Sequence, residues 1–211
     1  MEPAALITAF VTLLVVIDPV GLAPLFVALT PNMDRARRRA IALRATFTGM
    51  ALLTLFGIFG QSLLDIIGIS MPAFRISGGM LLFLIALEML FERRTKRRAG
   101  QASQAEDHPD DDPSIFPLAT PLIAGPGAMT TMILLAGQAE NTLQLVAVHL
   151  VMIAVVLTVL LFFLASGLIE RALGETGILV VTRLLGMLLA ALSVQFVLDG
   201  LRGVGLIQAL G

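Results

Sequence analysis

One carboxylate, Asp18, lies deep inside the apolar stretch Ala4–Leu29, in the segment VVIDPVGLAPLF. An ionisable side chain within a membrane segment is energetically costly, and such residues commonly mark the path of a substrate or an ion. A carboxylate at this depth could bind an ammonium group or carry a proton. Asp18 is also followed by Pro19, which is typical of a helix start with Asp18 as the N-cap. Both interpretations, cap and ligand, stay open, and one residue could serve as both.

A second segment, PLIAGPGAMTT, has no acid and offers a different chemistry. Gly125, Pro126 and Gly127 predict a helix start with exposed backbone N–H groups. The hydroxyl groups of Thr130 and Thr131 follow about one turn later. The N-terminus of a helix attracts anions, carboxylates included. The alternative is that these glycines only let helices pack closely, as small residues commonly do in membranes.

The two segments complement each other as binding groups for a zwitterion. Asp18, with Pro19 and Gly21 beside it, presents a carboxylate suited to an ammonium group, and the second segment presents donors suited to a carboxylate. A small amino acid carries both groups, and the glycines leave little lining for a large side chain. The chain shows no Ser/His/Asp set and no cluster of His and acids with metal-site spacing. We therefore expect no enzyme activity, no catalytic residue, no metal and no cofactor.

The composition places both segments in a membrane. The 211 residues are 57% hydrophobic, and the mean hydropathy is +0.95. These values are typical of integral membrane proteins. Only 14% of the residues are charged and the formal net charge is −1, so no nucleic-acid partner is expected. The expected partners are the lipid bilayer and a small-molecule substrate, while the oligomeric state is not predictable.

Six apolar stretches are long enough to cross a bilayer, which takes about 20 residues of helix. They are Ala4–Leu29, Ile41–Leu64, Met71–Phe91, Phe116–Gly137, Leu143–Leu168 and Ile178–Leu201. Six of the ten prolines fall in the segments Val15–Pro31 and Pro117–Gly137, which overlap the first and fourth stretches. Because proline removes a backbone donor, these two spans are predicted to be broken helices, which commonly mark a transporter's binding site.

Basic residues predict the orientation of the spans. All but Arg75 and Arg202 of the 14 Lys and Arg residues fall on the side opposite the N-terminus. Cytoplasmic loops carry an excess of basic residues, so both termini are predicted to lie outside, and loops 31–40 and 92–115 in the cytoplasm. Residues 92–115 also combine basic and acidic blocks without apolar periodicity, which predicts a solvated, mobile linker.

The two halves of the chain match each other at similar spacing. Arg75 and Arg183 lie 108 residues apart, and Gly21 and Gly127 lie 106 residues apart. Chance coincidence in apolar sequence is the alternative to a three-span unit used twice. Because three is odd, the second unit would enter the membrane from the opposite side, as an inverted repeat. The predicted parts are a first repeat over 1–91, the linker over 92–115 and a second repeat over 116–211.

Arg75 and Arg183 begin their spans, where the helix dipole disfavours a cation. Asp65 and Glu175 are candidate partners, and snorkelling to the interface is the alternative. Three further polar residues, Glu88, Gln195 and Asp199, have no role that the sequence assigns.

Four motifs resemble the MarC family of bacterial and archaeal membrane proteins. They are IDPVGLAPLFVALTP, FRISGGMLLFLIALEML, PLIAGPGAMT and RLLGMLLAALSVQFVLDGL. The resemblance implies a six-span inner-membrane protein akin to the LysE-type exporters, with some archaeal relatives described as transporters of glycine and alanine. By this resemblance, the positions of the family motifs correspond to Asp18, Pro19, Gly21, Gly125, Pro126, Gly127 and Thr130.

These observations favour a secondary transporter for small neutral amino acids, built as an all-α inverted repeat. Coupling to protons or to sodium would drive it. A passive channel, a structural membrane protein and an exporter of other small solutes are the alternatives. Saturable, competable uptake of a labelled substrate would separate a transporter from a pore.

Overall fold

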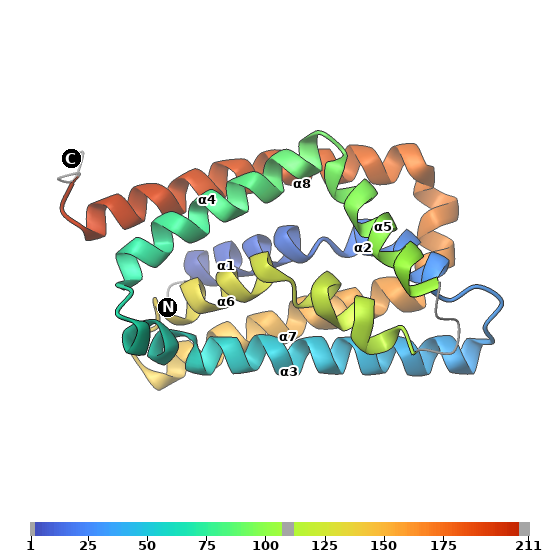
Figure 1. The fold of residues 1–211 in the computed structure, drawn as a ribbon, viewed down its shortest axis with the longest axis horizontal. Coiled ribbons are helices and arrows are strands. Elements are labelled where there is room, and N and C mark those ends of the chain that lie inside the picture. Colours follow the sequence, from blue (N-terminus) through green and yellow to red (C-terminus); the bar gives the residue numbers. More distant parts are fainter. Residues whose placement is uncertain (1–2, 107–111, 207–211) are drawn as a thin grey trace.

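The computed structural model describes residues 3–106 and 112–206 as an elongated bundle of helices (Figure 1). The first half contains α1 (Pro3–Ile17), α2 (Pro19–Leu29), α3 (Arg35–Ile67) and α4 (Met71–Leu90). The second half contains an irregular helix η1 (Ser114–Ile123), then α6 (Pro126–Ala136), α7 (Thr142–Leu164) and α8 (Ser166–Gly203). Helix α5 (Arg93–Glu106) connects the halves and crosses the bundle near one end.

Five helical stretches in the described residues are long and apolar enough to cross a membrane, and the pair of η1 and α6 makes a sixth if it is one span. This confirms an all-helical membrane protein with five to six candidate spans. The last span differs from its expected bounds, because α8 begins at Ser166 and continues past a non-helical Gly174. The inverted repeat stays a prediction.

Prolines force extended backbone inside η1, and the fourth span is broken after η1, at Ala124 and Gly125. Phe116 (φ −124°, ψ 125°) and Thr120 (φ −131°, ψ 123°) each precede a proline. A proline disfavours helical geometry in the residue before it, so η1 cannot be regular. Helix α6 then leaves η1 at a bend of 55°.

The first span is interrupted at Asp18 alone. Pro19 lacks the N–H that would continue the ladder of α1. Asp18 has φ 61° and ψ 67°, in the left-handed region that Asp tolerates better than most residues. Helices α1 and α2 nevertheless stay close to one line in Figure 1, and together they count as one span of 26 residues.

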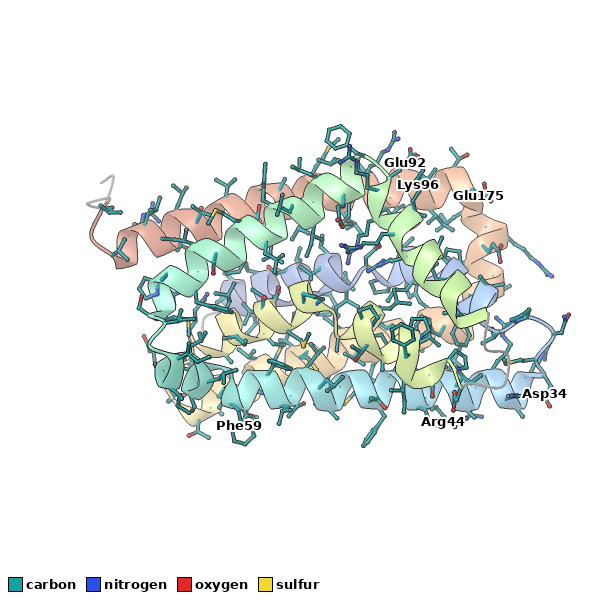
Figure 2. The ribbon with its side chains drawn as sticks, in the orientation of Figure 1. Asp34, Arg44, Phe59, Glu92, Lys96 and Glu175 are labelled. Atoms are coloured by element: carbon teal, nitrogen blue, oxygen red, sulfur yellow. The ribbon has the colours of Figure 1, made fainter. Side chains whose placement is uncertain are left out.

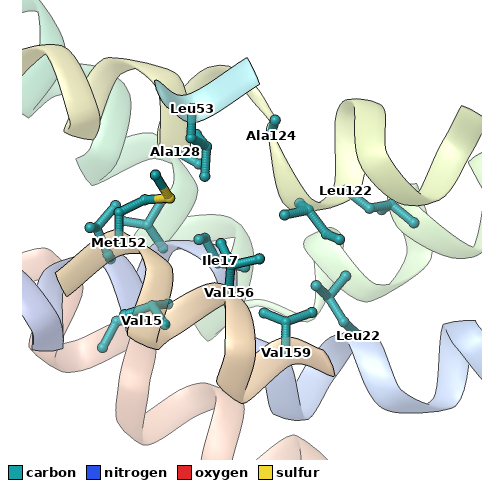
Figure 3. Close-up of a cluster of buried hydrophobic side chains, with 14 of the residues drawn as sticks. Val15, Ile17, Leu22, Leu53, Leu122, Ala124, Ala128, Met152, Val156 and Val159 are labelled. Carbon is teal, nitrogen blue, oxygen red and sulfur yellow. The ribbon is translucent and has the colours of Figure 1, made fainter. Parts of the chain in front are cut away.

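A buried apolar cluster holds the two breaks side by side (Figure 3). It combines side chains of the first span with those of the second break and of α7. The labelled members from these parts are Val15, Ile17, Leu22, Leu122, Ala124, Ala128, Met152, Val156 and Val159. Because each span contributes to this one core, neither break can shift without disturbing the other.

Large apolar side chains cover much of the outer surface. Phe47 is 73% exposed and Phe59 is 57% exposed, both on α3. Apolar residues on the outside are the normal condition for helices that contact lipid. The charged side chains labelled in Figure 2, among them Arg44, Glu92 and Lys96, lie instead toward the end of the bundle that holds α5.

The linker differs from the expectation of a solvated, mobile segment. Its first part is α5, in which Arg94 is 6% exposed and Arg98 is 5% exposed. The prediction was wrong for these residues because their charges have partners inside the bundle. Residues 107–111 of the linker lie outside the described ranges.

Helices α4 and α8 lie side by side along one face of the bundle (Figure 1), with glycines at their contact. A Cβ atom at Gly79 would lie 2.7 Å from the carbonyl oxygen of Ser193 and 3.0 Å from the backbone nitrogen of Val197. Backbone atoms cannot rotate away as a side chain can. Gly79 is therefore required for the close approach of the two helices.

We predict that Gly79→Ala lowers the free energy of unfolding by about 1–3 kcal/mol, because the added methyl group forces α4 and α8 apart. Gly167→Ala is the control, since a Cβ atom there would meet nothing within 4 Å. Thermal unfolding of the purified proteins in detergent measures both. Equal stability of the two variants would contradict this packing.

Candidate functional site

The end of α1 leaves backbone carbonyl groups without helical partners. The last four carbonyl groups of any helix have none within the helix itself. Here the following residue, Pro19, has no N–H, and the N–H of Gly21 donates instead to Oδ1 of Asp18 at 3.0 Å. The carbonyl groups of Val16 and Ile17 must therefore find donors elsewhere.

Two arginines of α5 supply these donors. Arg98 Nη2 donates to the carbonyl of Ile17 at 3.0 Å, and Arg94 Nη2 donates to the carbonyl of Val16. Residues four apart lie on the same face of a helix, so α5 presents both guanidinium groups together. A helix C-terminus carries partial negative charge and favours cations nearby. The two guanidinium groups therefore stabilise the end of α1 both by their hydrogen bonds and by their positive charge.

Asp18 is buried and fully engaged. Its side chain is 1% exposed, Oδ1 caps α2 through Gly21, and Oδ2 pairs with Arg98 Nη1 at 3.1 Å. The N-cap interpretation is thus confirmed. The carboxylate expected to face a substrate instead holds a guanidinium group. The role of Asp18 as a substrate ligand stays a prediction.

Arg94 is a buried cation with only neutral acceptors. Its Nη1 lies 3.0 Å from Met89 Sδ, and its Nε is buried without a hydrogen-bond partner among the described residues. Burial, with the charge of Arg98 beside it, lowers the pKa of Arg94 to about 9. At neutral pH the guanidinium group therefore keeps its charge.

The second break places the start of α6 opposite these arginines. Gly125 is the N-cap and offers no side-chain hydrogen bond, while Pro126 occupies the first helical position. The N–H groups of Gly127 and Ala128 have no partner within the helix, because they belong to its first turn. Glycine is needed at 125, where a Cβ atom would clash with the backbone carbonyl oxygen of Pro121.

A cavity of about 220 Å³ lies between the two breaks, α4 and α5. Helix α5 contributes Arg94, Arg97 and Arg98 to its wall. The remaining lining residues come from α1, α4 and the second break, and are Val16, Leu81, Ile85, Pro121, Leu122, Ile123, Gly125, Pro126, Gly127 and Ala128. The cavity thus combines apolar walls with guanidinium groups and a helix N-terminus, which is a chemistry suited to small anions.

The predicted site residues divide into two groups. Gly125, Pro126 and Gly127 line the cavity, whereas Asp18, Pro19 and Gly21 lie behind Arg98 and do not. Thr130 and Thr131 do not line it either. The Thr131 hydroxyl donates to the carbonyl of Gly127 at 2.8 Å, and the Thr130 methyl group lies against Gly78 of α4.

The sequence interpretation missed the arginines of α5. The spacing of Arg94 and Arg98 within ERRTKRR was the available indication, because it puts two cations on one helix face. Glu175 was also wrong as the expected partner of Arg183, which pairs with Glu92. Within the described ranges, no group of His, Asp and Glu side chains could hold a metal ion.

Comparison with known proteins shows what kind of molecule contains this site. Residues 4–205 match the sequence family described as MarC family integral membrane protein. The chain belongs to the MarC family. Membership confirms the resemblance that the four motifs indicated, and it shows that the chain is an integral membrane protein.

Relatives within the MarC family match over nearly their whole length. A UPF0056 membrane protein of Aquifex aeolicus is 38% identical over 197 residues, covering 93% of this chain and 92% of its own. The UPF0056 inner membrane protein YhgN of Escherichia coli is 34% identical over 200 residues, covering 93% and 96%. No solved structure matches the chain significantly.

We predict that Asp18 and Arg98 are energetically coupled. Arg98→Gln leaves a buried carboxylate unpaired, which should lower the free energy of unfolding by about 3–5 kcal/mol. Asp18→Asn keeps the cap but leaves the cation unpaired, so it should also destabilise. The double variant should lose less than the sum of the two, by about 1 kcal/mol or more.

Chemical unfolding in detergent measures this cycle, and Arg93→Gln is the matched control, since Arg93 is an exposed arginine on the same helix. Strictly additive losses would show that the buried pair does not hold α5 in place.

Proposed function

We propose that this MarC family protein is a secondary transporter that moves small neutral amino acids, such as glycine or alanine, across the inner membrane. One observation carries the proposal: the end of α1, through Val16, and the second break, through Gly125–Gly127, border the same small cavity inside an apolar bundle. Non-helical backbone at membrane depth is tolerated where it is buried in protein or lines a cavity, and transporters use it to bind substrates.

The proposed binding mode uses both breaks. The substrate carboxylate binds at the start of α6, and its ammonium group binds Asp18. In the present conformation Arg98 is paired with Asp18, so substrate binding requires the Arg98 side chain to leave Asp18 while Arg94 stays at the cavity. Exchanging a guanidinium group for an ammonium group keeps Asp18 paired throughout, which avoids the penalty of an isolated buried carboxylate.

The size and lining of the cavity support a small solute. Pockets for drug-sized ligands have volumes of roughly 300–1,000 Å³ and are often aromatic. This cavity has about 220 Å³, and no aromatic residue lines it. Both properties disfavour export of large amphipathic drugs.

The proposed architecture is a pair of inverted three-span repeats, with both termini outside and with loops 31–40 and 92–115 in the cytoplasm. The unequal distribution of basic residues supports this orientation, and the relative YhgN is named an inner membrane protein. Protons or sodium would drive transport, and the protein would not be an enzyme.

We predict saturable glycine or alanine uptake into proteoliposomes containing the purified protein. Asp18→Asn should abolish this uptake, because an amide cannot pair with the ammonium group. The control is Asp34→Asn, at an exposed aspartate that caps α3 through the N–H of Arg37 at 2.7 Å. It should transport like the parent.

Folded protein must be quantified for both variants, so that uptake is expressed per native molecule. Uptake that rises linearly with substrate concentration would indicate a passive channel. Undiminished uptake by folded Asp18→Asn would show that Asp18 is only a cap.

We predict that cysteine at Lys96 is protected from an impermeant thiol reagent in intact cells, whereas cysteine at Gln138 is labelled. Both positions are exposed, and the parent chain contains no cysteine that could react. Labelling at both positions after the cells are opened is the control for accessibility. The reverse pattern in intact cells would invert the proposed orientation.

A further inference from the structure

We infer that the cavity between α4, α5 and α6 is a binding site for a compact monocarboxylate, held by guanidinium groups of α5 and by the first N–H groups of α6. The inference rests on the proposed function in that it concerns the carboxylate end of the same substrate. It adds the arginines as ligands of the carboxylate, and it predicts that this part of the site binds a carboxylate that carries no ammonium group.

The charges around the cavity do not balance. Arg98 pairs with Asp18 at 3.1 Å, and Arg97 pairs with Glu88 at 3.0 Å. Arg94 has no carboxylate within ion-pair distance among the described residues. A buried charge is normally paired, so the excess cation at Arg94 indicates a place for an anion.

The unused donors point to the same place. Arg94 is 6% exposed, it lines the cavity, and its Nε has no hydrogen-bond partner among the described residues. The start of α6, an 11-residue helix whose N-cap Gly125 gives no side-chain hydrogen bond, lines the same cavity. Nη1 and Nη2 of Arg94 each use one N–H group, on Met89 and on the Val16 carbonyl, and each keeps a second N–H group. A carboxylate in the cavity could accept from these groups and from the start of α6, because both favour negative charge.

The walls restrict the class of anion. Val16, Leu81 and Ile85 give the cavity an apolar side that suits a short alkyl group. The same walls disfavour a dianion such as phosphate, because desolvation penalises charge steeply. The volume of about 220 Å³ leaves room for an alkyl chain of only a few carbons. Propionate is therefore the matched probe, and propionamide has nearly the same shape without the charge.

The test is thermal unfolding of the purified full-length protein in detergent, at constant ionic strength, with increasing sodium propionate. We expect a saturable rise in the unfolding temperature, because a ligand that binds the native state stabilises it by mass action. Propionamide and sodium chloride should give no saturable rise. Isothermal titration calorimetry then gives the dissociation constant.

Three arginine variants locate the site. Arg97→Gln removes a cavity-lining cation that does not contact the broken end of α1, and it should weaken propionate binding about tenfold. Arg93→Gln removes the same charge from an exposed position that does not line this cavity, and it should bind like the parent. Arg94→Lys keeps the charge but loses the planar fork, so it should also weaken binding.

Several results would overturn the inference: no saturable effect of propionate, equal stabilisation by propionamide or chloride, or equal losses in Arg97→Gln and Arg93→Gln. The two proposals fail separately. Propionate binding without amino-acid uptake would leave the carboxylate site standing and reject the amino-acid transporter. Amino-acid uptake that Arg97→Gln does not change, in a protein that does not bind propionate, would support the amino-acid transporter and reject the carboxylate site.

Discussion

The arrangement of the site depends on how the interrupted backbone of the first span is satisfied. Asp18 and Pro19 end α1 inside the bundle, where bulk water cannot donate to the freed carbonyl groups. Arg94 and Arg98 donate to the carbonyl groups of Val16 and Ile17, and Arg98 also neutralises the buried Asp18. The break therefore requires α5, and α5 in turn closes one side of the cavity.

Hydropathy and proline positions in the sequence predicted the spans and their breaks. They could not predict that α5 packs over the first break and closes one side of the cavity. Hydropathy and proline chemistry identified both interruptions, and the cap, one of the two roles that the sequence left open for Asp18, is confirmed. Helix α5 has no apolar periodicity, and its charges are typical of solvated sequence. Its burial depends on partners such as Ile17, which is 81 residues from Arg98, and only the folded chain brings them together. The roles of Thr130 and Thr131 likewise depended on which way α6 faces.

In this arrangement the partner of Asp18 can be exchanged: the Arg98 guanidinium group can give way to a substrate ammonium group. Arg98 holds the carboxylate that the proposed substrate ammonium group would use, so α5 and substrate compete for Asp18. Arg94 and the start of α6 remain available to the carboxylate end. The closed conformation would then be stabilised by the protein's own cations, and the open conformation by the substrate. Such competition links binding to movement of the linker, because a ligand shifts a conformational equilibrium through its differential affinity.

Hydrogen–deuterium exchange of the purified protein, with and without saturating alanine, tests this competition most directly. Exchange of backbone amides reports local opening of a helix. The account predicts that alanine speeds exchange in α5 (Arg93–Glu106) while it slows exchange in the first turn of α6, from Gly127 onward. Unchanged or slower exchange in α5, with alanine bound, would contradict the claim that the substrate displaces Arg98 from Asp18.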